Sequence, residues 1–86
     1  MSVNIPFRIT NGESETVHDS TVVHCVWVSG NTPQDKFEVT VTDGDSVKTV
    51  TVAPGSPKLV CGKKIVIKAT GAGINGANNG NLTPPS

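Results

Sequence analysis

The segment from Lys36 to Thr42, KFEVTVT, alternates between apolar and polar side chains over most of its length. Because successive side chains of a β-strand point to opposite faces, this two-residue period predicts a strand with one buried and one exposed face. The chain has only two leucines and one methionine, whereas valine and threonine are frequent, which favours strands over helices. No segment shows the 3.6-residue apolar period of an amphipathic helix. The chain is therefore predicted to be all-β.

Turn residues divide the first part of the chain into a series of strands. Pro6 cannot donate to a ladder of hydrogen bonds, so the strand that contains it is predicted to lie at a sheet edge. A two-residue loop at Asp43-Gly44 or Gly44-Asp45 keeps the apolar side chains of both flanking strands on one face. These features predict a small antiparallel β-sandwich of about six to seven strands, either immunoglobulin-like or a partly closed barrel. The six predicted strand segments are 3–10, 15–18, 21–29, 36–42, 46–53 and 58–70.

The composition changes sharply at Gly71. Four glycines, four asparagines and two prolines occur among the last 16 residues, GAGINGANNGNLTPPS. Such a segment has too few apolar side chains to build a core. We therefore expect residues 1–70 to form the β-sandwich domain and residues 71–86 to form a flexible tail or linker.

The segment from Thr21 to Gly30, TVVHCVWVSG, is apolar on both faces of the predicted strand. Its alternation predicts that Val23, Cys25 and Trp27 point into the core and that the other face points outward. A neighbouring strand would add two more outward valines, so that five of them form an apolar interface patch: Val22, Val26, Val28, Val60 and Val66. An exposed patch of this kind marks an interaction surface. The alternative is a strand that bends between two sheets and switches its inward face.

The two cysteines, Cys25 and Cys61, both fall on predicted core faces. They are candidates for a disulfide, which would stabilise the fold by roughly 4 kcal/mol in the chain-entropy model. The alternative is two buried free thiols that act as small hydrophobic side chains.

Charge and targeting patterns exclude several classes of partner. Seven basic and seven acidic residues give zero net charge, and no basic stripe with stacking aromatics is present, which predicts no nucleic-acid binding. No run of 18 apolar residues occurs, so no membrane span is predicted. The start, MSVNIPFRIT, lacks the pattern of a signal peptide, which predicts cytoplasmic synthesis. Membership of a virion and excision from an extracellular protein both remain open.

Motifs for catalysis or cofactor binding are missing from the sequence. There is no nucleophile elbow, phosphate loop or dinucleotide fingerprint, so we expect neither an enzyme nor a cofactor. His18 and His24 share a strand face by parity, but no third ligand has a suitable spacing, so no metal site is predicted.

These observations favour a non-enzymatic structural or assembly module. It would self-associate, or dock on a larger protein scaffold such as a virion, a fibre or a surface structure, through an apolar sheet face. The alternative is a module that binds a carbohydrate or another ligand through polar loops at one end of the sandwich, with Asn31 and Asp35 as the contact residues.

Overall fold

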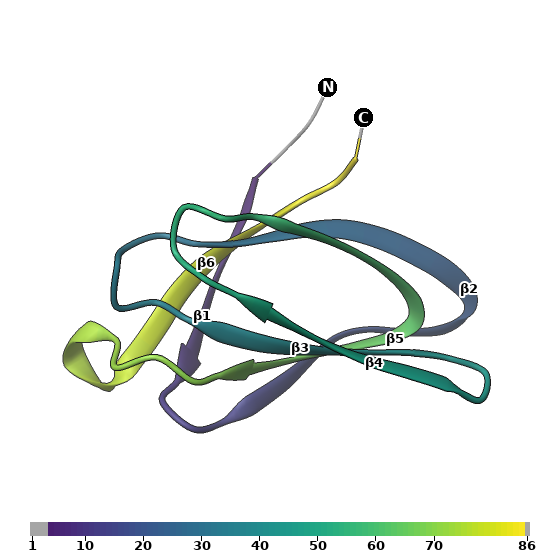
Figure 1. Cartoon of the computed structure of the whole chain (residues 1–86), viewed down its shortest axis with the longest axis horizontal. Helices are drawn as coiled ribbons and strands as arrows, with labels where there is room; N and C mark the ends of the chain where they lie inside the picture. The colour runs from purple at the N-terminus through teal and green to yellow at the C-terminus, as the bar shows by residue number, and fades with distance from the viewer. Residues whose placement is uncertain (1–3, 86) are drawn as a thin grey trace.

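A computed structural model describes residues 4–85 of the 86-residue chain, which form one antiparallel sheet of six strands (Figure 1). The order in the sheet is β1-β6-β2-β5-β3-β4, so β1 and β4 are the edges and the sheet is not closed. This confirms the all-β prediction. The elements are β1 (Ile5–Thr10), β2 (Ser14–Gly30), β3 (Phe37–Asp43), β4 (Ser46–Val52), β5 (Lys58–Ala69), a 3-10 turn η1 (Ile74–Gly76) and β6 (Ala77–Thr83).

The hairpin of β3 and β4 has the predicted register. Asp43 pairs with Ser46, which leaves Gly44 and Asp45 as a two-residue loop. Gly44 has a φ of 63°, as the first loop position of a type II′ turn requires. The edge position of β1 is also confirmed, because it pairs with β6 alone. Val3, predicted to belong to this strand, lies outside the described residues.

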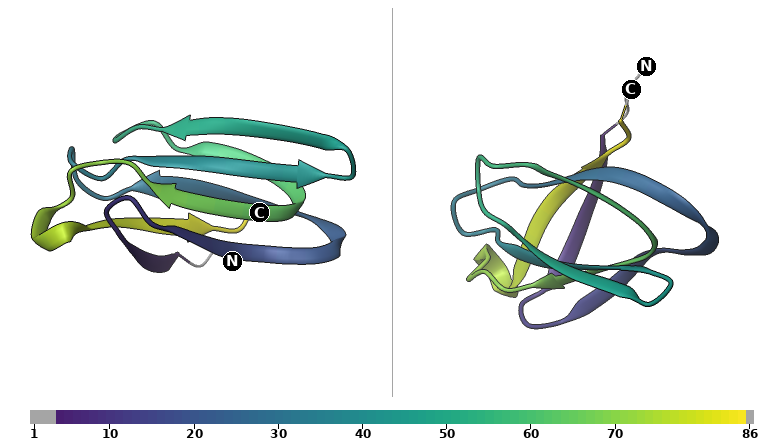
Figure 2. Two further views of the ribbon diagram at one scale, coloured as in Figure 1. Left: turned by 90° about the horizontal axis from the view of Figure 1, so that it is seen from below. Right: turned by 45° about the vertical axis from the view of Figure 1, so that its right-hand side comes forward.

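The two longest strands, β2 and β5, run side by side and bend together, so that the sheet folds over onto itself (Figures 1 and 2). Asp19 pairs with Lys64 and His24 with Gly62, so residues 20–23 of β2 lie opposite the single residue Lys63. A bulge of this kind bends and twists a strand. Gly62 is required here, because a Cβ at this position would lie 2.3 Å from Cγ1 of Val41 on β3.

The bend changes which side chains of β5 point inward. Val60 is buried before the bend, whereas Ile65, Ile67 and Ala69 are buried after it, so the inward face moves from even to odd positions. Both halves of the folded sheet contribute to one core, formed by Ile9, Val26, Val28, Phe37, Val39, Val41, Val52, Val60, Ile65, Ile67 and Ala69.

The prediction of a flexible tail from residue 71 is wrong for most of this segment. Residues 77–83 form β6, which lies between β1 and β2 and pairs with both. In Figure 1 the yellow strand runs beside the purple β1. The segment is thus an inner strand of the sheet, and the folded unit extends well beyond residue 70.

Two residues explain how such a polar segment occupies an inner strand. Asn78 is fully buried, and its side chain binds three separate loop segments: Nδ2 donates to Asn11 Oδ1 at 2.6 Å and to the Gly71 carbonyl at 3.1 Å, while Oδ1 accepts from the Lys36 backbone at 3.2 Å. Gly80 lies against Phe7, where a Cβ would be 2.6 Å from the ring. In this strand, the hydrogen-bonded amide of Asn78 and the close approach of the backbone at Gly80 therefore take the place of apolar side-chain packing.

Candidate functional site

Several apolar side chains lie exposed where the second half of β2 pairs with the first half of β5. Trp27 is directly opposite Leu59, and Cys25 is directly opposite Cys61. Directly paired residues of antiparallel strands project from the same face of the sheet. Trp27 is 39% exposed, Leu59 45% and Val23 47%, and Cys61 is also exposed. We call Val23, Cys25, Trp27, Leu59 and Cys61 the outer apolar face.

The predicted disulfide is confirmed, but not its location. Cys25 and Cys61 are joined across neighbouring strands of the same sheet, at a sequence separation of 36 residues. The sequence placed both cysteines on core faces. In the structure Cys25 is half-buried and Cys61 is exposed, so the disulfide lies within the outer apolar face.

The structure reverses the predicted faces of residues 25–28. Three of the five valines assigned to an exposed interface are core residues, namely Val26, Val28 and Val60. Of the other two, Val22 is 68% exposed in the bulge of β2, and Val66 is half-buried beyond the bend of β5. The structure does not bring these five valines together on the surface. Both faces of the strand are apolar as predicted, but the exposed face is the one that carries Trp27.

Polar side chains border the outer apolar face on the side of β6. Thr83 is directly opposite Trp27, and Asn81 is directly opposite Ser29. The Asn81 side chain donates to Asn31 Oδ1. The Trp27 ring is therefore flanked by hydroxyl and amide groups on one side and by Leu59 on the other.

Of the two residues predicted to bind a ligand, Asp35 has a structural role. Its side chain is buried, and its carboxylate accepts hydrogen bonds from the Thr32 backbone at 3.0 Å, the Thr32 hydroxyl at 2.9 Å and the Asn79 backbone at 3.1 Å. These contacts tie the loop after β2 to β6, and they leave Asp35 unsuited to a ligand at the surface. Asn31 is exposed and contacts Asn81.

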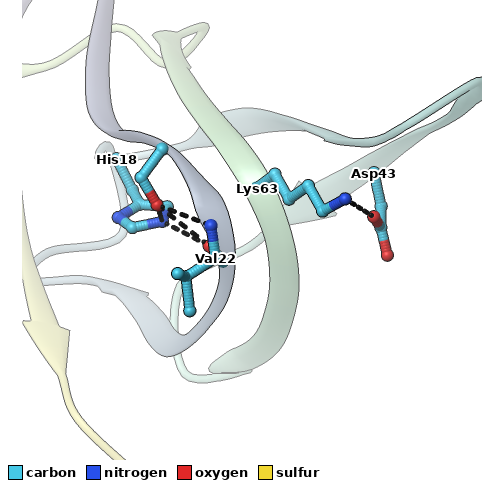
Figure 3. Close-up of polar contacts among 5 residues, drawn as sticks. His18, Val22, Asp43 and Lys63 are labelled. Atoms are coloured by element: carbon cyan, nitrogen blue, oxygen red, sulfur yellow. Dashed lines mark hydrogen bonds and ion pairs between the residues drawn. The ribbon is translucent and has the colours of Figure 1, made fainter.

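The bulge of β2 brings His18 and His24 together. Their rings stack with centroids 4.6 Å apart and an interplanar angle of 27°. His18 Nε2 donates to the Val22 carbonyl at 3.1 Å, and the Ser20 hydroxyl contacts both groups at 3.1 Å (Figure 3). The two rings therefore lie together as the sequence suggested, but the bulge, and not the parity of an unbroken strand, is the reason. The polar contacts hold the bulge in shape.

An ion pair lies at the bend of β5. Lys63 Nζ is 3.8 Å from a carboxylate oxygen of Asp43, which links β5 to the end of β3 (Figure 3). Both side chains are about half exposed, so this pair adds little stability.

A cavity of about 280 Å³ opens between β4 and the first half of β5. Sequence reasoning missed it, because it forms where two strands that are consecutive in the chain diverge. The one available signal was Lys48, a charged residue on the apolar face of the β3–β4 hairpin. The lining residues are Val41, Lys48, Val50, Leu59, Val60 and Cys61.

Within residues 4–85, no group of three or more histidine, cysteine or acidic side chains is arranged to hold a metal ion. No helix in the described part of the chain has the length and apolar character needed to cross a membrane. The chain matches no family model, no curated protein and no solved structure.

Proposed function

We propose that this protein is a non-enzymatic assembly module: a small two-layer β-sandwich that associates with a second copy of itself through the outer apolar face. The observation that carries the proposal is the exposed cluster of Trp27, Leu59 and Val23 around the disulfide. Contiguous exposed apolar surface with a polar border is typical of an interaction site. Leu82 and Phe7, which pack against the core from β6 and β1, support the two-layer description.

A second copy is the partner that best fits the chemistry of this face. None of its five residues is charged, so two such faces would meet without leaving a charge unpaired. The chain has zero net charge, which minimises repulsion between copies. A two-fold dimer would place the same patch on both sides of the interface. The disulfide holds β2 and β5 together here, which lowers the cost of ordering the face on binding.

The test is the molar mass in solution of the wild type and of Trp27→Arg, measured by light scattering over a range of concentrations. We expect a concentration-dependent dimer for the wild type. Trp27→Arg should weaken it by about 30-fold, because a buried tryptophan anchor contributes about 2 kcal/mol or more to an interface.

Val47→Arg is the matched control, because Val47 is also a strongly exposed apolar residue but lies on β4, outside the outer apolar face. It should dimerise like the wild type. A wild type that is monomeric at every concentration would contradict the proposal. Loss of the dimer in Val47→Arg alone would place the interface on β4 instead.

A second candidate function, carbohydrate binding, is favoured by the surroundings of Trp27. The sequence had placed this ring in the core, where no sugar could reach it. In the structure it is partly exposed beside Thr83, Ser29 and Asn81. An exposed aromatic ring with hydroxyl and amide groups at its edge offers apolar contact to a sugar ring together with partners for its hydroxyls.

Trp27 is the single tryptophan of the chain, so its fluorescence reports on this site alone. If the surface binds sugars, titration with soluble cello-, chito- or manno-oligosaccharides should shift the emission. Asn81→Ala should weaken the response by several-fold, through loss of about one hydrogen bond. An unchanged spectrum with every oligosaccharide at millimolar concentration would argue against this function.

A further inference from the structure

The cavity between β4 and β5 lies where one edge of β5 has no pairing strand. β3 pairs with β5 over residues 64–69 only, whereas residues 58–62 of β5 pair with β2 alone. A short turn, closed by the bridge between Ala53 and Ser56, connects β4 to β5. The two strands therefore begin close together at this turn and diverge from it. The cavity lies between them.

The walls of this cavity are apolar except at one position. Val50 is contributed by β4, Val41 by β3, and Leu59, Val60 and Cys61 by β5. Leu59 and Cys61 also belong to the outer apolar face, so the cavity adjoins that face. An aliphatic group that entered would contact aliphatic side chains on several sides, which is the usual character of a small-molecule site.

The exception is Lys48, which pairs with Val41 on the inner side of the hairpin. Its neighbours on the same face of β4 are Val50 and Val52 on one side and Ser46 on the other, so the lysine lies at the hairpin end of an apolar row. Within residues 4–85 the structure contains one ion pair, Lys63 with Asp43, and it does not involve Lys48. Lys48 thus lines an apolar cavity and forms no ion pair within residues 4–85.

We propose that this cavity binds a small amphiphilic anion, a monocarboxylate with an aliphatic tail. The tail would contact Val50, Leu59 and Val60, and the carboxylate would bind Lys48 Nζ. A single ammonium matches a single negative charge, whereas phosphate recognition gathers several donors. The volume of about 280 Å³ is just below the roughly 300–1,000 Å³ of sites for drug-sized ligands, which suits a smaller molecule such as a medium-chain fatty acid.

The test uses sodium octanoate below its micelle concentration, with octylammonium as a probe of the same tail and opposite charge. Binding is measured by calorimetry and by amide chemical shifts on the isotope-labelled protein. Octanoate should shift the amides of Val50, Leu59 and Val60. Octylammonium should bind at least tenfold more weakly.

Lys48→Gln should weaken octanoate binding about tenfold, because a charge-assisted hydrogen bond is lost. Lys48→Glu should abolish it and favour octylammonium. Lys48 is exposed, so both variants are expected to fold, which circular dichroism verifies. Lys68→Gln is the matched control: it removes the same charge from an exposed residue of β5 outside the cavity, and it should bind octanoate like the wild type.

Three results would overturn the proposal: no binding of octanoate, equal affinity in the wild type and Lys48→Gln, or chemical-shift changes centred on Trp27 instead of on the cavity. The cavity shares Leu59 and Cys61 with the outer apolar face, but Trp27 does not line the cavity and Lys48 is not part of the outer apolar face. Trp27→Arg is therefore expected to retain octanoate binding even where it abolishes the dimer, and Lys48→Gln to retain the dimer even where it weakens octanoate binding.

Discussion

Replacing Val26 with glutamate is expected to unfold the protein. Val26 is 4% exposed and pairs with Val60 in the core. A carboxylate at this position would be buried without a hydrogen-bond or ion-pair partner, at a cost of several kcal/mol. A domain of this size has a free energy of unfolding of about 5 kcal/mol. One such substitution is therefore enough to remove most of its stability.

Val22→Glu is the control for this prediction. Val22 is on the same strand but is 68% exposed in the bulge, so its substitution should change the free energy of unfolding by no more than about 0.5 kcal/mol. Urea unfolding followed by circular dichroism measures both variants. If Val26→Glu were as stable as the wild type, the second half of β2 would have to point the other way, as the alternation of the sequence alone suggested.

Loss of the disulfide is expected to have a similarly large effect. The Cys25–Cys61 bond closes a loop with a sequence separation of 36 residues, and the chain-entropy model assigns about 4 kcal/mol to such a constraint. The double variant Cys25→Ala/Cys61→Ala should lose about this amount in urea unfolding. Because Cys61 is exposed, its replacement opens no cavity in the core, so the loss reports mainly on the cross-link.

Reduction of the wild type supplies an independent check. Dithiothreitol should lower the urea midpoint of the wild type to that of the double variant, and it should leave the midpoint of the double variant unchanged. If the double variant were as stable as the oxidised wild type, the cross-link would not restrict the unfolded chain, and the stability would have to come from strand pairing alone.

The features that the sequence predicted correctly are local. The two-residue loop at Gly44 and Asp45 follows from the parity of the apolar residues on either side of it. The edge position of β1 follows from the missing backbone donor of Pro6. Each of these depends on residues close together in the chain, so no knowledge of distant partners is needed.

The assignment of faces failed for different reasons on the two strands. Along β5 it carried one parity across Gly62, and on residues 21–29 it chose the wrong one of two apolar faces. The bulge at residues 20–23 and the bend at Gly62 each shift the alternation. The alternative considered for this two-sided strand was a bend between two sheets that switches its inward face; the structure has such a bend, within a single sheet. The wrong choice of face on residues 21–29 placed Trp27 in the core, and so the outer apolar face was missed although its residues had all been noted.

The last strand shows a different failure. Composition argued against structure after Gly71, because asparagine and glycine have low strand propensity. In the folded protein, pairing with strands on both sides and the hydrogen bonds of Asn78 outweigh that preference. Their partners, Asn11 and Lys36, are far away in the sequence. Propensity takes no account of such partners.

Three features follow from local patterns of side-chain alternation and turn residues: the all-β class, the β3–β4 hairpin and the two apolar faces of residues 21–30. Three others emerge only in the folded chain: which of those faces is buried, where β6 pairs, and the cavity beside Lys48. These features depend on where the sheet bends and on which distant strands become neighbours. That choice is set by the packing of the whole core, which no local pattern contains.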